Sequence, residues 1–124
     1  MYLAAVLDEA SRQRLLDEVI GNVPTGHDIV CHHVTLHMGD RRSDDPNIGD
    51  SVLFSVDGVG IITDRVVAVR VRIETQGIKS DNLVPHVTVA VNRSVGAKPF
   101  ESNQITVWND IESFPLTGVV RVCL

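Results

Sequence analysis

His33-Val34-Thr35-Leu36 and His86-Val87-Thr88-Val89 share one pattern: a histidine, an apolar residue, a threonine and a second apolar residue. Both segments lie in runs of strand-forming residues. Side chains alternate between the two faces of a strand, so the histidine and the threonine share one face and the apolar residues share the other. The sequence therefore predicts two strands that each have a buried face and a polar His/Thr face.

The rest of the pattern predicts one domain over residues 1–124, with a single clear helix among several strands. An apolar stripe that includes Leu15 and Val19 predicts a helix that begins after Asp8 and stops at Gly21. One helix against many strands favours an α+β domain with mostly antiparallel pairing. The expected strands are Tyr2–Leu7, Asp28–Met38, a hairpin of Ser51–Val56 and Val59–Thr63 around Asp57-Gly58, Val66–Glu74, Val84–Val91, Gln104–Trp108 and Val119–Cys123.

Composition narrows the class of partner. The formal net charge of −5 argues against binding to duplex nucleic acid, although a small anionic ligand or an RNA end remains compatible with it. No apolar run reaches the length that crosses a membrane, and the first residues lack the basic region of a signal peptide. Cys31 and Cys123 have neither disulfide-framework nor zinc spacing, so a cytoplasmic location is expected. Oligomeric state is not indicated.

Two imidazoles and two hydroxyls that face one cleft suit acid-base chemistry on a phosphate. A neutral imidazole takes a proton from water, and a protonated one donates to the leaving oxygen, because the ordinary histidine pKa of about 6.5 lies near working pH. Thr35 and Thr88 would bind the non-bridging phosphate oxygens. This chemistry needs neither metal nor cofactor, and we expect none.

The paired motifs resemble those of the two-histidine (2H) phosphoesterase superfamily, which includes bacterial RNA-ligase-like proteins and the phosphodiesterase domain of fungal tRNA ligases. The stretch Lys98-Pro99-Phe100-Glu101-Ser102-Asn103 is similar to the fungal branch. The resemblance implies two similar lobes around a central groove, each of which contributes one motif. It also implies that His33 and His86 are the catalytic pair and that Thr35 and Thr88 bind phosphate.

Other residues are candidates for binding substrate around this pair. His37 is expected on the strand face of His33, and Tyr2 and Trp108 are the aromatic candidates for stacking on a base. Loop residues that follow the motifs provide further candidate contacts to phosphate or RNA: Arg41 after the first motif, and Lys98 and Ser102 after the second.

Simpler interpretations compete with each of these assignments. A histidine in a strand is commonly structural, and threonine has ordinary β-propensity. A metal site of His32, His33 and His37 is the main rival chemistry, but strand alternation would point His32 to the opposite face.

The sequence thus predicts a metal-independent phosphodiesterase acting on a cyclic phosphate, most simply the 2′,3′-cyclic phosphate of a nucleotide or RNA end. The alternative is a non-catalytic module that sequesters a cyclic nucleotide or an RNA-terminal phosphate. RNA ligase activity ranks below both, because the chain has no P-loop.

Overall fold

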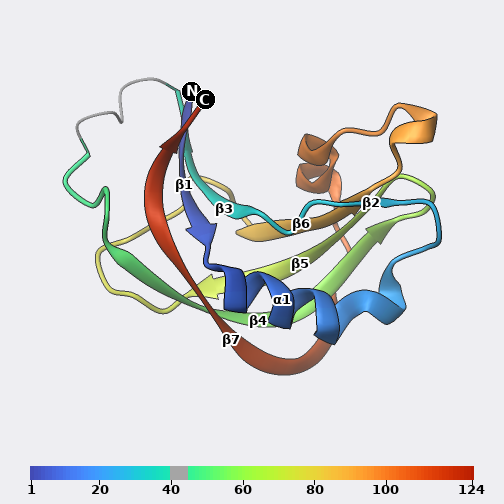
Figure 1. Ribbon diagram of the computed structural model, residues 1–124, viewed down its shortest axis with the longest axis horizontal. Coiled ribbons are helices and arrows are strands. Elements are labelled where there is room, and N and C mark those ends of the chain that lie inside the picture. Colours follow the sequence, from blue (N-terminus) through green and yellow to red (C-terminus); the bar gives the residue numbers. More distant parts are fainter. Residues whose placement is uncertain (40–44) are drawn as a thin grey trace.

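A computed structural model describes residues 1–39 and 45–124, which form one α-helix, seven strands and short 3₁₀ turns (Figure 1). The helical elements are α1 (Glu9–Val19), η1 (Ile20–Asn22), η3 (Arg93–Val95) and η4 (Pro99–Gln104). The strands are β1 (Tyr2–Leu7), β2 (Asp28–Ile29), β3 (His33–Met38), β4 (Ser51–Ile62), β5 (Val66–Ile73), β6 (His86–Val91) and β7 (Asn109–Cys123).

The strands form one closed, barrel-like sheet. Their order is β2-β6-β3-β1-β7-β4-β5, and a further pairing of β6 with β5 closes it. Every pairing is antiparallel. The α+β class with mostly antiparallel strands is therefore confirmed, whereas the two-lobed arrangement is not, because β3 and β6 are neighbours in this one sheet. No helix among the described residues is long and apolar enough to span a bilayer.

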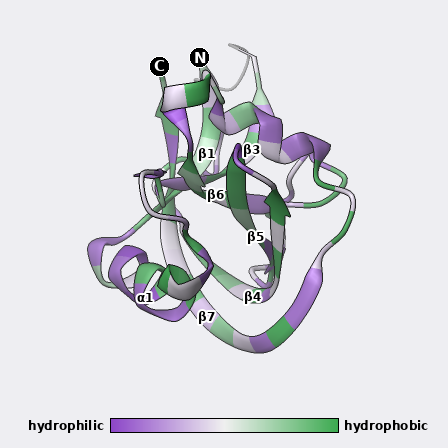
Figure 2. Ribbon diagram, turned by 90° about the vertical axis from the view of Figure 1, so that its right-hand side faces the viewer, coloured by the Kyte–Doolittle hydropathy of each residue, from purple (hydrophilic) through white to green (hydrophobic). Residues whose placement is uncertain are grey.

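The barrel interior is the hydrophobic core, to which the apolar faces of both motif strands contribute. Val34 and Leu36 of β3, and Val87 and Val89 of β6, are all nearly or fully buried in one cluster. Figure 2 shows hydrophobic colouring on these central strands. The His/Thr faces of the same strands consequently lie on the outside of the barrel, as the alternation predicts.

The predicted helix is confirmed in type and position. Asp8 is its N-cap, and the Asp8 carboxylate accepts a hydrogen bond from the Ser11 backbone N–H at 2.8 Å. Leu15 and Val19 are buried in the core, which fixes the inner face of α1. The helix packs mainly against β7.

The hairpin predicted around Asp57-Gly58 is wrong. Asp57-Gly58 is not a hairpin turn; it lies at a register shift inside the continuous strand β4. There the Asp57 carboxylate binds Arg70 of β5, so the dipeptide forms a bulge with an ion pair. The chain turns later, next to Asp64, which has a φ of 63°.

The predicted strand at Gln104–Trp108 is also wrong, because this segment packs over the sheet instead of joining it. A Cβ added at Gly60 of β4 would lie 2.5 Å from Ile105 Cγ2 and 2.8 Å from Trp108 Cε3. The final strand is longer than predicted and covers all of Asn109–Cys123.

The first motif strand begins later than predicted. Residues between Ile29 and His33 leave the ladder, and Cys31 has a φ of 43°, in the left-handed region that non-glycine residues rarely adopt. Cys31 is fully buried, and its backbone N–H still bonds to the Thr88 carbonyl at 3.0 Å. This irregularity changes where His32 lies.

Candidate active site

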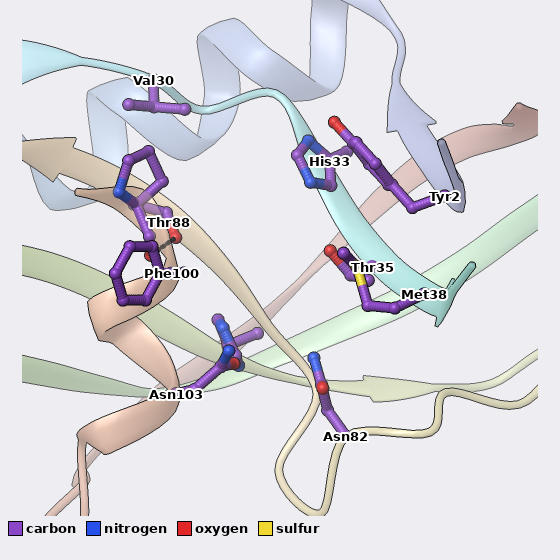
Figure 3. A pocket seen from close by; sticks show the side chains of 11 residues that line it. Tyr2, Val30, His33, Thr35, Met38, Asn82, Thr88, Phe100 and Asn103 are labelled. Atoms are coloured by element: carbon purple, nitrogen blue, oxygen red, sulfur yellow. Dashed lines mark hydrogen bonds between the residues drawn. The ribbon is translucent and has the colours of Figure 1, made fainter. Parts of the chain in front are cut away.

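A pocket of about 330 Å³ opens on the outer face of the barrel over β3 and β6 (Figure 3). Both motifs face it, and the walls come from β1, the loop before β6, and η4. The lining residues are Tyr2, Val30, His33, Thr35, Met38, Asn82, His86, Thr88, Pro99, Phe100 and Asn103. Residues 33–35 and 86–88, far apart in sequence, thus meet at one site.

The strand register explains how the two motifs come together. Val34 of β3 lies opposite Val87 of β6 in an antiparallel pair. One step along this register in either direction sets each motif histidine across from the threonine of the other motif. The two histidines are then diagonal neighbours across the strand pair, and both line the pocket. Each of the two strands therefore contributes one histidine and one threonine to the pocket floor.

His33 is a half-buried imidazole that favours its neutral form. Burial, then the nearby His32 and His86, lowers the pKa of His33 from 6.5 to about 4. The Nδ1 atoms of His32 and His33 lie 2.9 Å apart, in hydrogen-bond contact. The Tyr2 ring packs against the His33 ring, with the two ring centroids 5.1 Å apart. His33 Nε2 is thus the ring nitrogen left for a ligand.

His86 is oriented by a backbone group. Its Nδ1 lies 2.8 Å from the Val84 carbonyl oxygen, which only accepts, so Nδ1 carries a proton. This fixes the tautomer of the neutral ring and leaves Nε2 as its second functional nitrogen. Trp108 lies beside the imidazole, with ring centroids 6.3 Å apart. The bond to the carbonyl is kept in the neutral and in the charged ring, because Nδ1–H is present in both.

The two motif threonines have different surroundings. The Thr35 side chain lines the pocket, and its carbonyl accepts a hydrogen bond from Ser80 at 2.8 Å. The Thr88 hydroxyl contacts Ser102 Oγ at 2.9 Å and donates to the Pro99 carbonyl at 3.2 Å. Ser102 is 1% exposed and does not line this pocket, but it lines an adjoining pocket to which His86 also contributes.

The other candidates divide into those at the pocket and those away from it. Tyr2 lines it as expected. His37 does not; its imidazole binds the Asp81 carboxylate instead. Lys98 is exposed and outside the lining, where its backbone N–H donates to Glu101. Arg41 lies outside the described residues.

Sequence reasoning missed several residues at the site. Asn82 and Asn103 place amide groups at the pocket, and Phe100 forms an apolar wall while 64% exposed. They come from loops and η4, whose approach to β6 depends on tertiary packing. His32 was expected on the opposite face, but the irregular backbone before β3 brings its ring against His33. An unusually exposed aromatic such as Phe100 had no sequence signal of its own.

The described residues contain no group of three or more His, Cys, Asp and Glu side chains placed to hold a metal ion. The rival site of His32, His33 and His37 does not assemble, because His37 is turned to Asp81. Only the contact between His32 and His33 is made.

The family model described as the fungal tRNA ligase phosphodiesterase domain matches residues 27–120. The chain belongs to this family. Both motifs and η4 lie within the matched residues, so the resemblance to this branch of the 2H phosphoesterases is confirmed, and phosphodiesterase-type activity is supported at a general level. Comparisons with curated proteins and with solved structures gave no match.

Proposed function

We propose that the protein hydrolyses a cyclic phosphodiester, the 2′,3′-cyclic phosphate of a nucleotide or an RNA end, without a metal ion. The observation that carries this proposal is the antiparallel pair of Val34 with Val87, beside which the two motif histidines line one pocket. In this proposal, β3 and β6 each supply one motif and so take the part of the two lobes around the groove.

In the proposed reaction, His33 is the general base and His86 the general acid. His33 is neutral at working pH because burial lowers its pKa to about 4. Its Nε2 takes a proton from water while the water oxygen bonds to phosphorus. The ring P–O bond breaks, and the leaving 2′ or 3′ oxygen takes a proton from His86 Nε2. The product is a phosphomonoester.

Binding groups around the pair hold the phosphate in line. The Thr35 and Thr88 hydroxyls would donate to its non-bridging oxygens. Ser102 can donate to Thr88 Oγ1 when the Thr88 hydroxyl turns from the Pro99 carbonyl toward phosphate. The nucleoside would extend toward Tyr2 and Phe100, whose rings border the same pocket. The proposal includes a cytoplasmic location, where the protein would act on nucleotides or RNA ends.

The test offers 2′,3′-cyclic nucleotides and a short RNA with a 2′,3′-cyclic end to the purified protein in excess chelator. His33→Ala and His86→Ala are each expected to lower kcat roughly 10²-fold or more, with small effects on substrate binding. The matched control is His27→Ala, which removes a histidine that does not line the pocket.

Unchanged rates in both pocket variants would overturn the catalytic assignment. Tight binding by the wild-type protein with no product after hours would instead indicate the sequestering module. Activity that is lost on chelation would contradict the metal-independent reaction.

A further inference from the structure

His33 alone would be a poor general base. A buried imidazole is hard to charge, because burial removes water that would solvate the cation. His33 has this environment: burial is the main cause that lowers its pKa to about 4. An isolated His33 would therefore be a weak proton acceptor near neutral pH.

His32 lies where it can accept a proton from His33. Its Nδ1 is 2.9 Å from Nδ1 of His33, and the rings meet edge to face at 80°. His32 is exposed to solvent whereas His33 is half-buried. The positive φ of Cys31 and the bond of the Leu7 N–H to the His32 carbonyl at 2.9 Å hold the backbone in this conformation.

A hydrogen bond between two ring nitrogens contains one proton. When neutral His33 holds that proton on Nδ1, its Nε2 is bare and faces the pocket, while His32 carries its own proton on Nε2. If Nε2 of His33 then accepts a proton, the bridging proton can cross from His33 Nδ1 to His32 Nδ1. Both rings then carry an Nε2 proton, and the positive charge lies on the exposed ring.

We propose that His32 is a positioning residue for the reaction and that His32 and His33 act as one base, with the charge passed to His32. The inference rests on the proposed function. In the step, a water O–H bond breaks and His33 Nε2–H forms, while His33 Nδ1–H breaks and His32 Nδ1–H forms. After product release, the pair returns its extra proton to solvent through His33 Nε2.

Within residues 1–39 and 45–124, His86 has no neighbouring group that could accept its Nδ1 proton in this way. Its Nδ1 bonds to the Val84 carbonyl, which accepts a hydrogen bond but takes no proton. Among the described residues, the ionisable groups near the pair include His86, whose charge acts on His33, Tyr2 of β1, against the His33 ring, and the adjoining Cys31, on which Arg12 of α1 acts. Because the two rings share protons, their titration belongs to the pair.

The test compares His32→Phe and His32→Gln with the wild type. Phenylalanine removes the acceptor, whereas glutamine keeps a carbonyl that orients His33 Nδ1–H but takes no proton. We expect kcat to fall on the order of 10- to 100-fold in His32→Phe and less in His32→Gln, with KM nearly unchanged. The matched control, His27→Gln, should keep the wild-type rate.

The acidic limb of the kcat/KM profile separates this role from charge repulsion alone. If His32 shares the proton, both variants leave a buried His33 without an outlet for charge, and the limb moves to lower pH. If His32 only repels charge on His33, its removal relieves that repulsion, and the limb moves to higher pH. The second result would overturn the proposal.

Ring ¹⁵N spectra provide a readout that does not need activity. At neutral pH, the wild-type protein should show His33 with its proton on Nδ1, and on acidification the first proton should bring both imidazoles into intermediate shifts together. Titration of His32 and His33 as two independent groups would contradict the shared base. This outcome is distinguishable from failure of the proposed function, which would leave the spectra as expected without turnover.

Discussion

His33 and His86 differ in the group that holds Nδ1, and this difference divides their proposed roles. A carbonyl oxygen fixes His86, whereas a second imidazole contacts His33. Residue type alone would make the motifs equivalent. Burial and the contact with His32 favour the neutral form of His33, whereas the Val84 carbonyl fixes the ring of His86 through Nδ1–H.

Ser102 provides a prediction at the scale of one hydroxyl. Its Oγ lies 2.9 Å from Thr88 Oγ1 and is buried, so Ser102→Ala removes the group that orients the Thr88 hydroxyl. We expect a severalfold rise in KM for a 2′,3′-cyclic nucleotide and a loss of about 1 kcal/mol in the free energy of unfolding. Steady-state kinetics and urea denaturation measure the two effects.

The control for that change is Ser94→Ala, which removes an exposed serine hydroxyl bonded to Asn92 in the same half of the chain. Equal KM values for the two variants would show that Ser102 does not act through Thr88.

At the scale of elements, the segment from η4 to Trp108 forms one side of the pocket and is attached to the rest of the protein at two places. The Glu101 carboxylate binds Arg65 and accepts the Lys98 N–H at 2.7 Å, which holds η4 near the turn after β4. Farther along, Ile105 and Trp108 pack over Gly60. The position of Phe100 at the pocket therefore depends on both attachments.

The Glu101 attachment predicts a pH-dependent contribution to stability. The hydrogen bond from Arg65, and then that from the Lys98 backbone, lowers the Glu101 pKa below 4.5. The carboxylate therefore stabilises the fold fully above pH 4.5, and this stabilisation is lost as pH falls through the lower folded-state pKa. The difference in urea midpoint between wild type and Glu101→Gln should shrink as pH decreases from 7 to 3. A difference that stays constant with pH would contradict this assignment.

The Gly60 contact predicts a large effect from one methyl group. Gly60→Ala would bring a Cβ to 2.5 Å from Ile105 Cγ2, so the covering segment must move. We expect a loss of roughly 1–3 kcal/mol in the free energy of unfolding. Gly21→Ala is the control, because its added Cβ would have no atom within 4 Å. Equal thermal midpoints for both variants would show that the segment does not pack on β4 as described.

Local patterns were sufficient to predict some elements and not others. The His/Thr alternation predicted the buried faces of β3 and β6, and Asp8 predicted the start of α1, because both depend on neighbours in sequence. The hairpin prediction at Asp57-Gly58 was wrong because this dipeptide occurs both in turns and in bulges. Only the pairing with β5 decides between the two. His32 misled because strand alternation fails where the backbone leaves the ladder.

At the scale of the whole molecule, barrel closure makes the site. β6 pairs with β5 along most of its length and meets β3 at Val34 and Val87, so closing the sheet brings the two motifs together. Sequence spacing contains no information on that pairing, since it depends on contacts between distant strands. The resemblance to a family predicted the meeting of the motifs, and the topology supplies its physical cause.

The most direct test of the central claim is a crystal structure of the protein with a bound 2′- or 3′-nucleoside monophosphate. We predict that the phosphate lies between Nε2 of His33 and Nε2 of His86, within hydrogen-bond distance of the Thr35 and Thr88 hydroxyls, with the nucleoside toward Phe100. A phosphate bound elsewhere on the barrel, with the pocket over β3 and β6 still open, would contradict the account.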